Sequence, residues 1–284
     1  MKFSQFRISR RSVAVAAALV SMVSLAIGAH AALNMRALDA AKAVATEQAD
    51  AVPGRPSRLA LVIGNGHYPD ANAPMTQPIN DARALTATLR RDGFDVDVVE
   101  DATKDDMTRA IARLKSRIKP DSVVMLFFGG YGVQAGHESY MIPVDATIWK
   151  EADVRRDGVS IESVLEAMKE QGACAKLVVL DASRRNPYER RFRTFSHGLA
   201  PISAPDNALI LTSAAPGQVA DDSKGQHSVL MTELLNHLTA QAAAAETVFN
   251  STRVAISRAS DGAQVPTVSS SLLEDVRFGA NAGS

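Results

Sequence analysis

The feature that most constrains this chain is a repeated alternation of short apolar runs with longer amphipathic segments. Residues 59–63 and 123–128 are continuous apolar runs, and a glycine follows each of them directly. Runs of this length, bounded by turn residues, are typical of strands buried on both faces of a sheet. Residues 79–91 and 104–118 carry apolar side chains at helical spacing instead. The sequence therefore predicts strands that alternate with helices.

The same alternation continues toward the C-terminus. We expect further strands and helices there: strands at 95–99, 177–180 and 208–211, a hairpin within 133–142, and helices at 160–169, 228–238 and 242–257. Ser160 is placed to cap the helix that follows it. Such alternation predicts an α/β three-layer sandwich, a mainly parallel sheet with helices on both faces. In sheets of this kind the functional crevice lies beyond the carboxyl ends of the strands.

The N-terminal segment has a different character. Basic residues precede an apolar run over 13–27, and a small-x-small cleavage pattern follows at 29–31. This pattern predicts a signal peptide over 1–31 and an exported protein, periplasmic or secreted, without membrane association after cleavage. An uncleaved membrane anchor is the alternative. We expect residues 32–57, rich in alanine and ending in prolines, to be a linker, and 58–280 to be the folded domain.

Charge, cysteine content and residue spacing argue against a nucleic-acid partner and against a bound metal. Lys+Arg and Asp+Glu are both 31, so the formal net charge is zero, which argues against a nucleic-acid partner. Cys174 is the single cysteine. We interpret it as a structural or surface residue, because it precedes the strand predicted at 177–180. No His, Cys, Asp or Glu cluster has transition-metal spacing, so we expect neither a metal nor another cofactor.

Several motifs fall at or near the expected strand ends. They are Ala60–Asn65 with Tyr68, Pro78–Ala82, Phe127–Gln134, Tyr140–Asp145, Val179–Pro187 and Ala214–Gln218. In these motifs, from about Arg58 to Phe278, the chain resembles the bacterial caspase-like cysteine peptidases, the orthocaspases and metacaspase relatives. The resemblance implies a caspase-like fold and membership of a family of cysteine-type endopeptidases.

The two catalytic positions of that family are substituted here. In the family, the third-strand loop reads Gly-His-Gly and the fourth reads Asp-Ala-Cys-Arg, with His as general base and Cys as nucleophile. The matching positions hold Tyr131 and Ser183. A phenol is protonated at neutral pH, and a serine hydroxyl attacks only when a positioned base takes its proton. We therefore expect a pseudo-peptidase that binds a peptide or protein partner without cleaving it.

The substrate-binding positions are retained. The resemblance implies that Asp81 and Asp181 help form a pocket for an Arg or Lys side chain, held by charge-assisted hydrogen bonds. Each aspartate also has a structural interpretation. Asp81 would cap a helix beginning near it, and Asp181 would brace the loop that carries Ser183.

Two other functions stay open. One is an active endopeptidase that uses Ser183 with a displaced base, His137 or His67; we interpret His227 as a loop residue. The other is a regulatory subunit that dimerises with itself or with an active relative. The basic cluster of Arg184–Arg193 fits a solvated loop, or a self-cleavage site of the kind the resemblance implies. Some metacaspases depend on calcium, but the sequence locates no calcium ligands.

Overall fold

The computed structural model describes residues 56–69, 74–184, 198–220, 225–239 and 243–279. The predicted signal peptide, nearly all of the predicted linker and the basic residues 185–193 lie outside these ranges. Within the described ranges, no helix combines the length and the apolar character that a membrane crossing needs.

The central sheet of the described chain has six strands in the order β2-β1-β3-β7-β8-β9. Five of them run parallel, and only the edge strand β9 is antiparallel to its neighbour. The strands are β1 (Arg58–Gly64), β2 (Asp95–Glu100), β3 (Val123–Gly129), β7 (Ala175–Asp181), β8 (Ala208–Thr212) and β9 (Thr267–Ser270). The predicted mainly parallel sheet is confirmed, and β9 is a strand that the sequence pattern did not predict.

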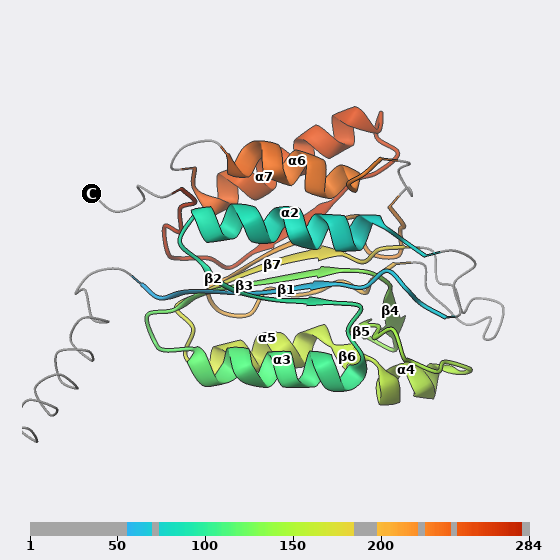
Figure 1. Cartoon of the computed structure of the whole chain (residues 1–284). Helices are drawn as coiled ribbons and strands as arrows, with labels where there is room; N and C mark the ends of the chain where they lie inside the picture. The colour runs from blue at the N-terminus through green and yellow to red at the C-terminus, as the bar shows by residue number, and fades with distance from the viewer. Residues whose placement is uncertain (1–55, 70–73, 185–197, 221–224, 240–242, 280–284) are drawn as a thin grey trace, which may run out of the picture. The chain divides into compact units, whose positions relative to one another are not determined.

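Helices cover both faces of this sheet (Figure 1). One face carries α2 (Gln77–Arg91), α6 (Val229–Leu238) and α7 (Ala245–Ala259), and the other carries α3 (Lys104–Arg117) and α5 (Ile161–Glu170). Val62 belongs to the core under the first group, whereas its neighbour Leu61 belongs to the core under the second. Successive strand residues thus serve opposite cores, which is why the strands read as continuous apolar runs.

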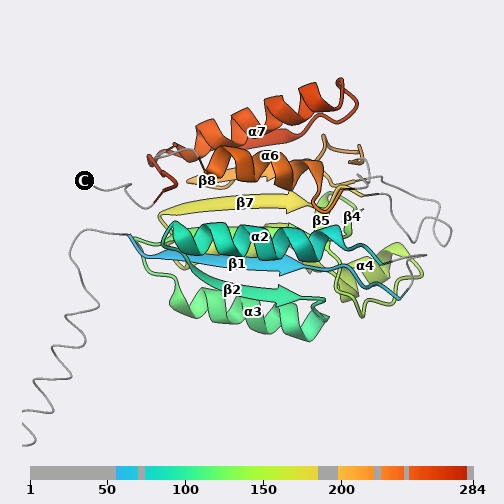
Figure 2. The same ribbon diagram turned by 45° about the horizontal axis from the view of Figure 1, so that its top comes forward.

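A smaller antiparallel sheet lies beyond the carboxyl ends of the central strands (Figures 1 and 2). It consists of β4 (Gly132–Ala135), β5 (Glu138–Met141) and β6 (Val159–Ser160), with α4 (Glu151–Asp157) beside it. The β4–β5 pair is the predicted hairpin, and Ser160 caps α5 by accepting a hydrogen bond from the Ser163 amide. The sequence pattern predicted neither α4 nor β6, since both are very short.

Candidate functional site

Tyr131 and Ser183, the two positions that the resemblance matches to the catalytic residues of the family, lie just beyond the ends of adjacent strands. In the β3–β7 pair, Gly129 is opposite Asp181, and Tyr131 and Ser183 each follow two residues later. The Gly130 amide donates to the Asp181 carbonyl at 3.2 Å, and the Gly132 amide donates to the Ala182 carbonyl at 2.9 Å. These hydrogen bonds continue the strand pairing into the loops, so they hold the two positions on neighbouring segments.

Tyr131 is packed as part of an aromatic pair. Its ring meets that of Tyr68 edge-on, with 4.7 Å between the ring centroids. The Tyr131 amide donates to the Tyr68 hydroxyl at 3.1 Å, and that hydroxyl donates to the Ile142 carbonyl at 2.9 Å. Gly130 permits this close approach, because a Cβ at that position would lie 2.6 Å from the Tyr68 hydroxyl. Tyr131 is therefore held in place by Tyr68 through both its ring and its backbone amide.

Ser183 is fully buried. Its hydroxyl has no hydrogen-bond partner among the described residues. Its backbone is fixed instead: the amide donates to the Ser213 hydroxyl at 3.4 Å, and the carbonyl accepts from the Ala220 amide at 2.6 Å. A serine nucleophile needs a base within hydrogen-bond reach and access to substrate. The described residues supply neither to this hydroxyl.

The two candidate bases lie away from Ser183. His137 is exposed in the turn between β4 and β5, after Ala135–Glu138, which is the last residue pair of this hairpin. The first residue pair of the hairpin, Gly132–Met141, directly follows Tyr131 in the chain. At about 3.3 Å per strand residue, this separates the turn from the start of the hairpin by roughly 10 Å. His67 follows β1, which β3 separates from β7, and two strand spacings are also roughly 10 Å.

Asp81 lies within α2 rather than at its start. The N-cap of this helix is Thr76, so the expectation that Asp81 caps a helix beginning near it is wrong. Its carboxylate is completely buried, and it accepts hydrogen bonds from His227 Nδ1 at 2.7 Å and from the Ser228 amide at 3.2 Å. Ser228 is the N-cap of α6. Asp81 therefore ties α2 to the beginning of a helix almost 150 residues further along the chain.

Asp181 ends β7 and is also buried. One of its carboxylate oxygens lies 3.2 Å from Nη2 of Arg184, whose side chain is only 3% exposed. This contact braces the turn that carries Ser183, as the structural interpretation of Asp181 expects. Burial and the negative charge of Asp181 raise the pKa of Asp81 to about 6, against the hydrogen bonds from His227 and Ser228. The two carboxylates are thus close enough to interact.

Two residues of this site were missed by the sequence analysis. Arg184 was placed in a solvated loop, and its position three residues after Asp181, across a tight turn, was the signal that could have indicated an ion pair. His227 was interpreted as a loop residue. It lies 146 positions from Asp81, so no local pattern could have joined them.

Cys174 lies at the opposite end of the sheet, directly before β7. Its thiol contacts the Asp121 carbonyl at 3.3 Å. Burial, followed by the charges of Glu274 and Asp121, raises the pKa of the thiol, which disfavours the reactive thiolate. In the described residues, no three His, Cys, Asp or Glu side chains are arranged to hold a metal ion.

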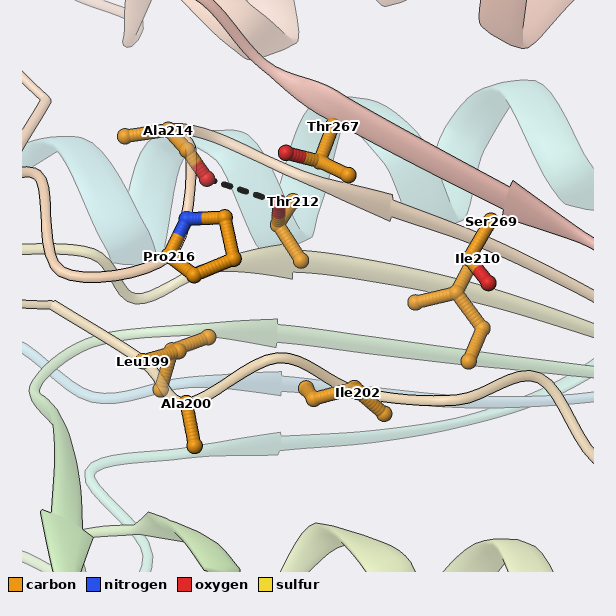
Figure 3. Close-up of a pocket in the computed structure, with 9 residues that line it drawn as sticks. All are labelled: Leu199, Ala200, Ile202, Ile210, Thr212, Ala214, Pro216, Thr267 and Ser269. Atoms are coloured by element: carbon orange, nitrogen blue, oxygen red, sulfur yellow. Dashed lines mark hydrogen bonds between the residues drawn. The ribbon is translucent and has the colours of Figure 1, made fainter. Parts of the chain in front are cut away.

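A small apolar pocket lies near the carboxyl end of β8 (Figure 3). The segment 199–202 forms one side of it, and β8, β9 and the loop after β8 form the other. Its lining residues are Leu199, Ala200, Ile202, Ile210, Thr212, Ala214, Pro216, Thr267 and Ser269. The lining contains neither Asp81 nor Asp181, so the pocket offers contacts to apolar groups and is distinct from the acidic pair.

Comparison with known proteins agrees with this architecture. The caspase domain family matches residues 57–277. The human mucosa-associated lymphoid tissue lymphoma translocation protein 1 is 27% identical over 144 residues, which are 50% of this chain and 17% of that protein. Its mouse homolog is 27% identical over 133 residues, 46% of this chain and 16% of the homolog. The chain thus covers less than a fifth of these relatives. Because the family match spans most of the sequence, the chain belongs to the caspase domain family.

Proposed function

We propose that this protein is a caspase-like domain that binds a peptide or protein partner through a basic side chain and does not cleave it. The observation that carries this proposal is the state of Ser183. Its hydroxyl is buried and without a hydrogen-bond partner in the described residues. Tyr131 follows the adjacent strand β3, two residues after the partner of Asp181.

None of the described residues places a base within hydrogen-bond reach of the Ser183 hydroxyl, which supports the lack of cleavage. Removal of one member of a catalytic triad lowers the rate by several orders of magnitude, and both family positions differ here. Tyr131 offers a phenol, which keeps its proton at neutral pH and cannot act as the general base.

The acidic pair supports binding of a basic side chain. Asp81 in α2 and Asp181 at the carboxyl end of β7 are two buried carboxylates that interact with each other. A guanidinium or ammonium group that displaces part of their present hydrogen bonding would gain charge-assisted bonds in a site screened from water. The apolar pocket at the end of β8, the strand next to β7, would hold a neighbouring side chain of the same peptide.

The test is a paired assay of cleavage and binding on peptides that end in Arg, Lys or Gln. We expect no cleavage by the wild type or by Ser183→Ala, and calorimetric binding of the Arg and Lys peptides alone. Asp181→Asn should weaken that binding at least tenfold, and the matched exposed variant Glu100→Gln should leave it unchanged. Cleavage that disappears in Ser183→Ala, together with labelling of Ser183 by a fluorophosphonate, would overturn the proposal in favour of an active peptidase.

The proposal also places the protein outside the cytoplasm, with the N-terminal basic and apolar pattern as its support. N-terminal sequencing of the protein from a periplasmic fraction should then find a start close to residue 32. A mature protein that co-purifies with an active relative would favour the regulatory-subunit function instead.

A further inference from the structure

The burial of Arg184 is unusual for its residue type. Arginine is almost never fully buried unless its charge is paired, yet this side chain is 3% exposed and contacts the buried carboxylate of Asp181. Among the described residues, the buried charged side chains are Asp81, Asp153, Lys176, Asp181 and Arg184. Three of these five belong to the candidate site, so the protein concentrates its desolvated charge there.

This contact changes what the acidic pair can offer to a ligand. Asp181 already shares its charge with the guanidinium of Arg184, and Asp81 already accepts hydrogen bonds from His227 and the Ser228 amide. A second guanidinium that approached Asp181 in unchanged surroundings would therefore be desolvated beside the like charge of Arg184, with one carboxylate shared between two cations.

We propose that Arg184 is an internal ligand of the basic-side-chain site, so that a peptide arginine or lysine binds only when it displaces the Arg184 guanidinium from Asp181. This inference rests on the proposed function. It adds that the chain competes with its own partner, and that the residue directly after Ser183 sets the affinity.

The expected effect follows from competition within one molecule. A tethered group acts at an effective concentration in the millimolar range. The apparent affinity of an external ligand is reduced in proportion to the fraction of molecules whose site is free. Removing the internal ligand should therefore tighten binding by at least tenfold.

The first test is binding of an Arg-terminated peptide to Arg184→Met, in which an apolar side chain of similar reach replaces the guanidinium. We expect at least tenfold tighter binding than in the wild type. The control is Arg83→Met, which removes an arginine from the exposed ion pair with Glu100 and should leave the affinity unchanged. Equal or weaker binding by a folded Arg184→Met would overturn the inference while leaving the proposed function in place. Absence of binding in both proteins would overturn the proposed function.

The second test needs no peptide. Arg184→Ala should lower the melting temperature, because it leaves the buried Asp181 carboxylate without its cation. Millimolar methylguanidinium should restore part of that loss with a saturable dose dependence, whereas methylammonium should restore less and the wild type should not respond. If the variant does not fold unaided, refolding with and without methylguanidinium gives the same comparison. A variant as stable as the wild type, or one insensitive to methylguanidinium, would overturn the inference.

Discussion

The described chain contains two Asp–His pairs near the carboxyl ends of the parallel strands, and the pKa values of their aspartates are shifted in opposite directions. His227 Nδ1 lies 2.7 Å from Asp81, and His67 Nδ1 lies 2.6 Å from Asp101. The chemistry of the two contacts is therefore the same. Yet the pKa of Asp81 is raised to about 6, whereas the pKa of Asp101 is lowered below its ordinary value.

Burial and neighbours explain the difference. Asp81 is fully buried and interacts with the negative charge of Asp181, and both effects favour its protonated form. Asp101 is 32% exposed. Partial burial acts to raise its pKa, but hydrogen bonds from the Gly66 and His67 amides, at 2.8 and 2.9 Å, and from the His67 ring outweigh it. A histidine partner alone thus does not decide whether a carboxyl group is ionised.

The largest expected effect is a difference in pH dependence between wild type and Asp81→Asn. Since the folded pKa of Asp81 lies above the unfolded value of 3.8, the folded state binds more protons between about pH 4 and pH 6. The wild type should therefore lose unfolding free energy as pH rises through this window, by roughly 2 to 3 kcal/mol. Asp81→Asn should lack this loss.

Urea unfolding at a series of pH values measures both profiles. The same comparison in a His227→Gln background removes the titration of the imidazole itself. Asp101→Asn provides the opposite control, because a lowered carboxyl pKa adds stability above pH 3.8 that is lost only on further acidification. Parallel profiles for wild type and Asp81→Asn would contradict the assigned role of burial.

A smaller difference is expected between the stability losses caused by removing the two histidine rings. His227→Ala removes the ring donor to a buried carboxylate that also accepts a hydrogen bond from the Ser228 amide, and should destabilise the protein by about 1 to 2 kcal/mol at pH 7. His67 is 62% exposed, so His67→Ala should change the stability by less than about 0.5 kcal/mol. Equal losses in denaturant unfolding would show that the two pairs contribute alike.

The smallest difference in stability is expected between two substitutions of Asp101. Asp101 has a positive φ of 47°, a conformation that asparagine tolerates better than most residues. Asp101→Ala should cost about 1 kcal/mol, since it removes the acceptor of two loop amides and leaves an alanine in the left-handed region. Asp101→Asn should cost less than about 0.5 kcal/mol. If the two variants unfolded at the same urea concentration, neither the conformation nor the amide bonds would contribute measurably.

Much of the fold could be predicted from the sequence because its signals are local. The apolar runs of β1 and β3 and the helical periodicity of α2 and α3 each depend on residues close together in the chain. The order of these elements predicted the parallel sheet, and the loop motifs indicated the caspase-like family. The elements that were missed, α4, β6 and β9, are 7, 2 and 4 residues long, which is too short for a period to emerge.

The sequence by itself determined the apolar runs and the loop motifs, and through these motifs it predicted that Tyr131 and Ser183 stand at the catalytic positions of the family. Only the tertiary structure decided what surrounds them: a Ser183 hydroxyl that is buried without a described partner, an Asp81 bonded to His227, and an Asp181 bonded to Arg184. The physical reason is that ionisation and access depend on burial and on charges brought from distant segments. Sheet pairing places Tyr131 beside Ser183, and the packing of α2 against α6 places Asp81 beside His227, although 52 and 146 positions separate them in the chain.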